Sequence, residues 1–344
     1  MNKPSVSIIV PVYNVGPYVE DCIRSVMRQT YDGSMECIVV DDCDTDDSME
    51  KVEKLVAEYA GPISFKVLHH THNRGLSAAR NTGMDEATGD YLFFLDSDDE
   101  LVENCIEKLA APLELERYDF VLGNVKYIKV LPSNQIQDAH GPQELNISES
   151  LILQPPMILR RYRKDWKGVA WNKLYHTSFL RQYHLEFKEG LLYEDNLWSF
   201  QIACLASSLY IVNQITYIHK KRGGSIMDTS TENEFISYLK IIVPEMRMFV
   251  DKYQIDNADI FPQFNYFFCK ILDFHSRTYT EYASIYKVIR PYIKVPIKYV
   301  FNSNRFCIKK NLHDLHYLLP MSIAPLWQYI VFYRLHPLIN KRMI

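Results

Sequence analysis

The stretch Tyr91–Asp99, with the sequence YLFFLDSDD, is a run of apolar residues that ends in three closely spaced acids. Such an apolar run is typical of a strand buried on both faces of a parallel sheet. Ligands of open α/β sheets bind where these strands end, so we expect Asp96, Asp98 and Asp99 to lie at a binding edge. Clustered carboxylates repel one another unless a divalent cation lies between them, and oxygen ligands favour Mg²⁺ or Mn²⁺. The alternative is that these acids only cap the helix that follows.

The chain around this stretch alternates between apolar strand patterns and helical patterns. Strands are expected at 5–11, 36–42, 65–69, 91–96 and 120–125, and helices at 19–29, 48–59, 77–87 and 102–115. This alternation predicts an α/β fold with a parallel sheet and flanking helices. The direction of the strand at 120–125 is left open, and the polar stretch 132–148 is expected to be a loop. From Glu234 onward the pattern is helical, with breaks expected at Pro244, Pro262, Pro291 and Pro296.

Composition sets the class of protein. A chain of 344 residues with 47% hydrophobic content can bury a sizeable core. Its seven cysteines show no CxxC spacing, and no signal-peptide pattern precedes the first apolar run, so we expect a reducing cytoplasm and no structural zinc. Without a stretch of eighteen apolar residues, a simple membrane-spanning helix is not expected.

Charge is concentrated at the C-terminal end of the chain. From Ala283 to Ile344 there are ten Lys or Arg and one acid, Asp314, so this segment carries +9 within a chain of net charge -4. Aromatic residues are interleaved with these cations, as suits an anionic interface. We expect peripheral association with the inner face of the cell membrane. Nucleic acid is not expected as a partner, because no nucleic-acid-binding motif accompanies the charge.

Two common phosphate-binding motifs are missing from the sequence. Neither GxGxxG after the first strand nor GxxxxGK[ST] occurs anywhere, which argues against a dinucleotide-binding Rossmann unit and a P-loop NTPase. A phosphotransferase of the haloacid-dehalogenase type also uses Asp-x-Asp, but on its first strand, whereas here the motif follows the fourth. Any bound phosphate is therefore expected to be held by a metal and by Arg or Lys.

Several stretches together resemble the family-2 glycosyltransferases of the GT-A fold. They are Val6–Asn14, Ile38–Asp42, Asn73–Gly83 and Phe94–Asp99, followed by Trp171–Tyr175 and Tyr193–Asp195. The first four occur in the order and spacing of that family. The resemblance implies a Rossmann-like nucleotide-binding half at 1–130 and an acceptor half at 131–230, with a helical C-terminal region at 231–344 outside it.

The resemblance also implies roles for particular residues. Pro11 and Tyr13 would hold the nucleobase, Asp42 would accept its imino hydrogen, Asp96 would lie near the ribose and Arg80 near the donor phosphates. Asp98 or Asp99 would bind the metal, with His219 as a further ligand, although a lone histidine is more often a packing residue. Arg222, on a Gly-Gly loop, would close over the diphosphate, unless that loop is only a solvated turn. Asp195 matches the catalytic base of the family.

These roles describe an inverting, metal-dependent hexosyl- or N-acetylhexosaminyltransferase. The expected donor is a nucleotide sugar, with UDP as the nucleotide, and the expected acceptor is a glycan or lipid-linked molecule of surface polysaccharide synthesis. The alternative is a catalytically inactive module of the same fold that binds a glycan or a partner protein. The presence of Asp96, Asp98, Asp99 and Asp195 argues against that alternative.

Overall fold

The computed structural model describes residues 3–130, 136–141, 144–145, 147, 149–162, 166, 168–221, 232–264, 279–294 and 315–330. The chain divides into two compact units, Met1–Thr229 and Ser230–Ile344. The division lies beside the expected start of the helical region at residue 231. The expected subdivision of the first part at residue 130 coincides with the end of β6 (Phe120–Val130), and strands from both sides of it belong to one sheet.

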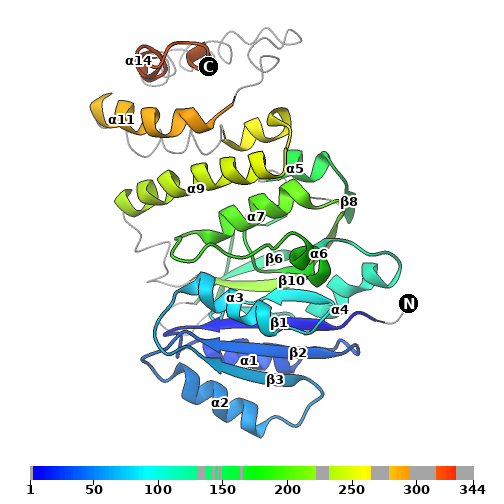
Figure 1. The fold of residues 1–344 in the computed structure, drawn as a ribbon. Coiled ribbons are helices and arrows are strands. Elements are labelled where there is room, and N and C mark those ends of the chain that lie inside the picture. The colour runs from blue at the N-terminus through cyan, green and yellow to red at the C-terminus, as the bar shows by residue number, and fades with distance from the viewer. Residues whose placement is uncertain are drawn as a thin grey trace. The chain divides into compact units, whose positions relative to one another are not determined.

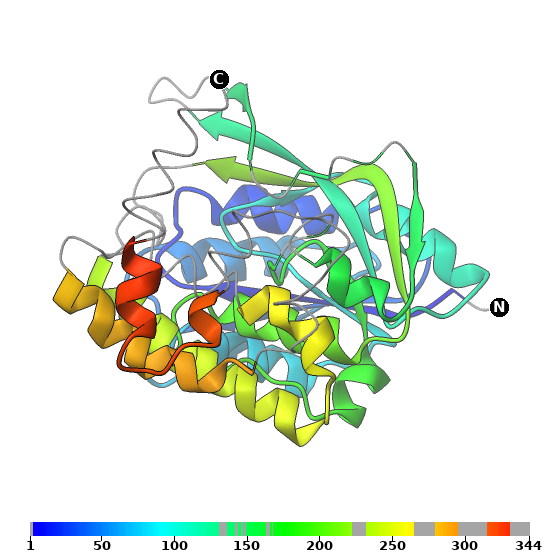
Figure 2. The same cartoon turned by 90° about the horizontal axis from the view of Figure 1, so that it is seen from above.

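The first unit is built on a mixed ten-stranded sheet (Figure 1). The remaining strands are β1 (Val6–Val12), β2 (Met35–Asp41), β3 (Ser64–His69), β4 (Tyr91–Phe94), β5 (Glu100–Leu101), β7 (Ile136–Ala139), β8 (Leu151–Leu153), β9 (Lys173–His176) and β10 (Leu209–Lys221). Strands β3, β2, β1 and β4 are neighbours in this order and are parallel. The antiparallel strand β9 then joins β4 to β6. Strand β6 is parallel to β10, and the two long strands lie side by side in Figure 2.

Helices pack on both faces of this sheet. In the first unit they are α1 (Val19–Met27), α2 (Ser48–Glu58), α3 (Leu76–Glu86), α4 (Cys105–Ala110), η1 (Ala111–Glu114), α5 (Met157–Arg161), α6 (Thr177–Gln182) and α7 (Glu194–Leu205). Every residue of β1 is buried, as expected for a strand covered on two sides. The expected α/β fold with flanking helices is therefore confirmed, but the sheet is mixed and not parallel throughout, because β5, β7, β8 and β9 pair antiparallel with their neighbours.

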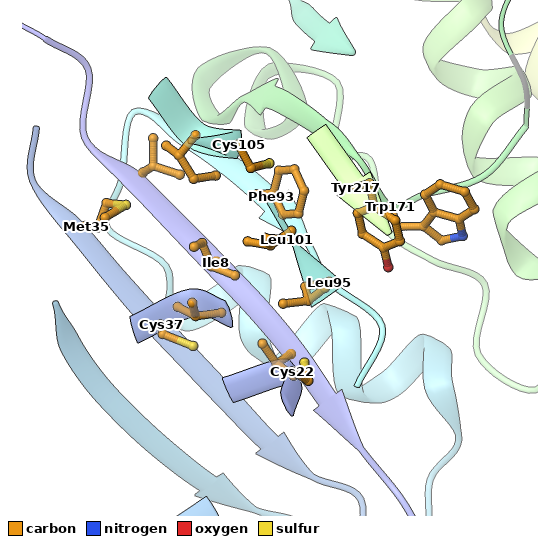
Figure 3. Packing of buried hydrophobic residues seen from close by; sticks show 14 of the residues in the cluster. Ile8, Cys22, Met35, Cys37, Phe93, Leu95, Leu101, Cys105, Trp171 and Tyr217 are labelled. Carbon is orange, nitrogen blue, oxygen red and sulfur yellow. The ribbon is translucent and has the colours of Figure 1, made fainter. Parts of the chain in front are cut away.

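One face of the sheet packs against α1, α2 and α4. Ile8, Phe93 and Leu95 belong to a continuous core with Cys22 of α1 and Cys105 of α4, and Figure 3 shows these side chains together. Each large apolar side chain buried here stabilises the fold by about 1.5–3 kcal/mol. This core holds β1 and β4 rigidly, so the loops that follow them start from fixed positions.

The opposite face packs against α3 and α7. A Cβ on Gly83 of α3 would lie 2.4 Å from a methyl group of Ile9, so only glycine lets the helix approach β1 this closely. Phe94 of β4 makes edge-on contacts with Phe187 and with Trp198 of α7. Aromatic contacts thus join α7 to the same strand that carries the acidic loop.

The local patterns mispredicted two segments of the first unit. The expected helix at 102–115 is replaced by the shorter helix α4 and the 3-10 turn η1, and strand β5 directly precedes this segment. The expected loop at 132–148 contains strand β7, which pairs with β6. The two short strands pair differently: β7 pairs with β6, the strand just before it in the chain, whereas β5 pairs with the distant β10. The pairing of β5 is set by long-range contacts that a local sequence pattern does not reveal.

The described part of the second unit is helical. It contains α9 (Glu232–Lys252), a helical segment at 257–264, α11 (Tyr279–Ile289), η2 (Arg290–Tyr292), η3 (Leu315–Tyr317) and α14 (Ala324–Ile330). Pro244 and Pro262 lie inside helices, so the breaks expected there are wrong, whereas Pro291 lies in η2 where α11 ends. Pro296 lies outside the described residues. None of the described helices combines the length and apolar content needed to cross a membrane.

Candidate active site

Four residues expected to bind the donor lie at the carboxyl ends of neighbouring strands. Pro11 is in β1, Tyr13 follows that strand, Asp42 follows β2, and Asp96 follows β4. Because β1 pairs in parallel with both β2 and β4, these ends form one edge of the sheet. Tyr13 is 46% exposed, as a residue that stacks on a base must be. The fold therefore brings these four residues together, and their contacts with a nucleotide stay predictions.

Asp42 is occupied by contacts within the protein. Its Oδ1 accepts hydrogen bonds from the backbone N–H of Arg74 at 2.8 Å and from Nδ1 of His70 at 2.7 Å, and its Oδ2 accepts one from the N–H of Gly75 at 2.7 Å. Gly75 has a φ of +88°, which side-chain-bearing residues rarely adopt. Asp42 thus fixes the start of α3. These contacts satisfy its carboxylate without a bound nucleobase.

Arg80 is buried between two carboxylates. It is 2% exposed, its Nη2 donates to Asp96 Oδ1 at 2.8 Å, and its Nη1 donates to Glu194 Oε1. Burial lowers the pKa of Arg80, but the charges of Asp96 and Glu194 outweigh it and raise the pKa above its ordinary value. Both terminal nitrogens of Arg80 thus bind protein acids, and its expected contact with the donor phosphates stays a prediction.

Asp98 and Asp99 differ in their surroundings. Asp99 is fully buried and accepts hydrogen bonds from Tyr217 Oη at 2.9 Å, His219 Nδ1 at 2.8 Å and the backbone N–H of Lys220 at 2.8 Å. Burial raises the pKa of Asp99 to about 6, opposed by its bond to His219. Asp98 is partly exposed. Of the two expected metal ligands, Asp98 is therefore the accessible one, and Asp99 holds the acidic loop against β10.

Aromatic stacking supports the contacts between Asp99 and β10. The Trp171 ring stacks on Tyr217 at 4.6 Å and on His219 at 5.6 Å between centroids, and Figure 3 shows Trp171 beside Tyr217. Tyr217 also accepts a hydrogen bond of 3.3 Å from the backbone N–H of Asp96. The sequence singled out the stretch Trp171–Tyr175 but gave Trp171 no role, and it gave none to Tyr217. Alternation along β10, which places Tyr217 and His219 on one face, was the available signal.

Asp195 lies in the first turn of α7. It is partly exposed and accepts a hydrogen bond of 3.0 Å from Nδ2 of Asn196, while Glu194 before it is buried. The positive end of the helix dipole stabilises a carboxylate at this position. Lys173, which is fully buried, is close enough to Asp195 for the two charges to interact, although burial still lowers the pKa of Lys173 to about 7. A partly exposed carboxylate beside such groups can accept a proton from a bound hydroxyl.

The basic stretch Lys220–Arg222, at the end of β10, is only partly described. Arg222, expected to close over the diphosphate, lies outside the described residues. The side chain of Lys220 bonds Asp21 at 2.9 Å and Glu100 at 2.7 Å, and the Lys221 ammonium bonds a backbone carbonyl. Lys220 and Lys221 are therefore engaged within the protein, and the role of Arg222 stays a prediction.

Few side-chain atoms in the described residues could serve as ligands of a metal ion. Within the described residues, no group of three or more His, Cys, Asp or Glu side chains is arranged to hold an ion. Asp98 is partly exposed, and His219 uses Nδ1 for Asp99. Mg²⁺ is commonly held by one or two carboxylates together with substrate phosphates. The residues present fit an ion of that kind, completed by a bound diphosphate.

Comparison with known proteins agrees with this geometry. The profile of glycosyl transferase family 2 matches residues 7–183. Glycosyltransferase GlyG of Streptococcus pneumoniae serotype 4 is 30% identical over 230 residues, which cover 65% of this chain and 73% of that protein. The chain belongs to glycosyl transferase family 2. It is therefore a glycosyltransferase, and the family resemblance of its motifs is confirmed.

A second relative adds a solved structure. The poly(ribitol-phosphate) beta-N-acetylglucosaminyltransferase TarS of Staphylococcus aureus is 25% identical over 246 residues, which cover 70% of this chain and 40% of that protein. The crystal structure of S. aureus TarS residues 1–349 in complex with UDP-GlcNAc matches with a TM-score of 0.66 at 19% identity, covering 98% of this chain and 92% of that one. This structural likeness confirms the GT-A fold.

Proposed function

We propose that this family-2 glycosyltransferase is an inverting enzyme that transfers a sugar from a UDP-sugar to a glycan or lipid-linked acceptor in surface polysaccharide synthesis. The observation that carries the proposal is the position of Arg80. Its guanidinium bonds Asp96, at the expected donor edge, and Glu194, which directly precedes the expected base Asp195. A donor at the sheet edge and an acceptor hydroxyl at α7 would thus meet at one place.

The reaction follows from these positions. Asp195 would take the proton of the acceptor hydroxyl as the hydroxyl oxygen forms its bond to the anomeric carbon. The bond from that carbon to the diphosphate oxygen breaks, with its electron pair leaving on the nucleoside diphosphate. Attack from the face opposite the leaving group inverts the anomeric configuration, and no covalent enzyme intermediate is required.

We also propose Mn²⁺ or Mg²⁺ as the cofactor. Asp98 would hold the ion, with His219 as its second protein ligand and Asp99 fixing the orientation of that ring through Nδ1. When bound, the ion would supply positive charge to the leaving diphosphate. The other steps depend on this chain: Tyr13 orients the base, Asp96 faces the ribose, and Asp195 moves the proton.

We also propose that the protein meets its acceptor at a membrane surface. The uncharged run 315–330, apart from His316, lies within the basic C-terminal segment. Its exposed apolar side chains are Leu318, Met321, Ile323, Leu326 and Ile330. Apolar groups flanked by cations suit an anionic lipid surface, so a cytoplasmic, peripheral location is proposed. Leu326→Glu should reduce sedimentation with phosphatidylglycerol vesicles, whereas Leu115→Glu, at an exposed apolar residue of the first unit, should not.

Donor binding is the direct test of the proposed function. Calorimetric titration of UDP, GDP and UDP-N-acetylglucosamine, each with and without Mn²⁺, should show metal-dependent binding of the uridine nucleotides. UDP-N-acetylglucosamine is the first sugar to test, since it is the ligand named for the TarS crystal. Binding of GDP in preference to UDP would overturn the nucleotide assignment. Binding without any turnover of the donor, by transfer or hydrolysis, would favour the inactive module.

A further inference from the structure

Arg80 combines complete burial with incomplete hydrogen bonding. The side chain is 2% exposed, and Nε is buried with no hydrogen-bond partner among the described residues. Arginine is almost never fully buried unless it is paired. Yet buried ion networks are often no more stabilising than packed apolar side chains of the same volume. Stability alone therefore gives no sufficient reason for a guanidinium at this position.

The two acids that Arg80 bonds come from distant parts of the fold. Asp96 follows β4 at the donor edge, and Glu194 is the first residue of α7. Asp195 is the next residue, so its Cα lies about 3.8 Å from that of Glu194. Holding Glu194 therefore restricts the backbone position of the base, and the same guanidinium holds the carboxylate expected to face the ribose.

The packing around Arg80 prevents it from swinging away. Its guanidinium lies 5.1 Å from the centroid of the Phe187 ring, which stacks on Trp198 of α7 at 4.2 Å. Phe187 is in turn fixed by Asn81, whose side-chain amide donates to the Phe187 carbonyl at 2.9 Å and accepts from its N–H at 2.8 Å. The bridge between β4 and α7 is thus enclosed by side chains of α3, α7 and the segment before α7.

We propose that Arg80 is a positioning residue that ties Asp96 to Glu194 and so holds the bound donor and the base Asp195 at a fixed separation. The inference rests on the proposed function of this site. Arg80 does not touch the reacting atoms; it acts through the two carboxylates. Its planar, forked donor group suits this role, because a lysine ammonium is a single point of charge.

The first test is Arg80→Lys, which keeps the charge and shortens the bridge. Loss of the bridge lets Asp195 move relative to the donor, so we expect kcat for transfer to fall by about 10²-fold. Donor Kd should stay within about tenfold, since Tyr13 and the metal site are untouched. The share of donor hydrolysed by water should rise, because the acceptor hydroxyl loses its base.

The second test compares two changes at Glu194. The side-chain oxygen of Gln still accepts a hydrogen bond from Arg80, whereas Ala removes the acceptor. We therefore expect Glu194→Gln to retain about tenfold more transfer activity than Glu194→Ala. A matched control is Glu86→Ala, at the other end of α3, which removes an exposed ion pair with Lys66 and should leave kcat unchanged.

The outcomes separate this inference from the proposed function. If Arg80 is merely structural, Arg80→Lys should have a lower Tm than the parent. The variant molecules that still bind donor should then have the kcat of the parent and hydrolyse the same share of the donor. That result, with Asp195→Asn inactive and the parent active, would overturn the positioning role alone. Equal activity of Glu194→Gln and Glu194→Ala would do the same. A parent protein that transfers no sugar from any nucleotide would overturn the proposed function instead.

Discussion

The donor edge and the acceptor side of the site are built in different ways. At the donor edge, Tyr13, Asp42 and Asp96 each follow their own strand, and three parallel strands bring them together. The acceptor side joins this edge through hydrogen bonds between residues more than one hundred positions apart, in which β10 holds Asp99 and α7 holds Arg80. The first kind of arrangement is local and is visible in the sequence. The second depends on how distant segments meet.

The comparison predicts that changes at the two regions affect different quantities. Loss of an exposed donor-edge side chain such as Tyr13 should weaken nucleotide binding and leave the fold intact. Loss of a connecting residue should alter stability or the rate of transfer. The following variants test this separation, in order of decreasing expected effect.

The largest effect is expected for Asp195→Asn. Asn is nearly isosteric with Asp and still accepts hydrogen bonds, but it cannot take the proton of the acceptor hydroxyl. Transfer should fall by about 10²–10⁴-fold. Donor affinity, measured by calorimetry, should stay within about fivefold, because the donor edge is unchanged. Unchanged transfer would remove Asp195 from the mechanism, and a comparable loss of donor affinity would place it in donor binding.

The neighbouring acids Asp98 and Asp99 should respond in opposite ways. Asp99→Ala leaves three donors, two of them buried, without their acceptor, so we expect the free energy of unfolding to fall by about 3 kcal/mol in urea titrations. Asp98→Ala should cost less than about 1 kcal/mol. It should instead abolish the Mn²⁺-dependent part of UDP binding. If Asp98→Ala is the destabilised variant and binds UDP normally, the two acids have been assigned in the wrong order.

Tyr13→Ala should have a smaller effect, confined to the donor. Its exposed ring is expected to stack on the base, so UDP binding should weaken by about 1–3 kcal/mol. Tyr13→Phe, which keeps the ring, is the matched control and should bind UDP like the parent. Equal affinity of Tyr13→Ala and the parent would leave Tyr13 without a role in recognition.

The smallest effect on the reaction is expected for Lys173, which acts on stability through pH. Burial lowers the pKa of Lys173 from 10.5 to about 7, so the unfolded chain binds more protons than the native protein between these values. This residue therefore makes stability rise as pH increases from 7 to 10.5. Lys173→Met should remove that contribution, which urea unfolding at neutral and alkaline pH would measure. The control is Lys126→Met, at an exposed lysine, which should keep the pH dependence of the parent. If Lys173→Met also keeps that pH dependence, Lys173 stays charged in the native protein and the prediction is wrong.

The sequence predicted the positions of Tyr13, Asp42 and Asp96 well because each motif there combines a buried strand with the loop that follows it. Strands β1, β2 and β4 begin and end within one or two residues of their expected positions, and their acids lie where the strands end. It could not distinguish Asp98 from Asp99, since their difference arises from Tyr217 and His219 on β10. Nor could it give Arg80 its partners, because Glu194 lies 114 residues along the chain.

The most direct test of the account is the anomeric configuration of the product. Transfer from a UDP-sugar of known configuration, followed by proton NMR of the new linkage, reports whether the anomeric carbon has been inverted. The account predicts inversion, because Asp195 acts as a base for a single attack from the face opposite the diphosphate. A product that retains the configuration of the donor would contradict it.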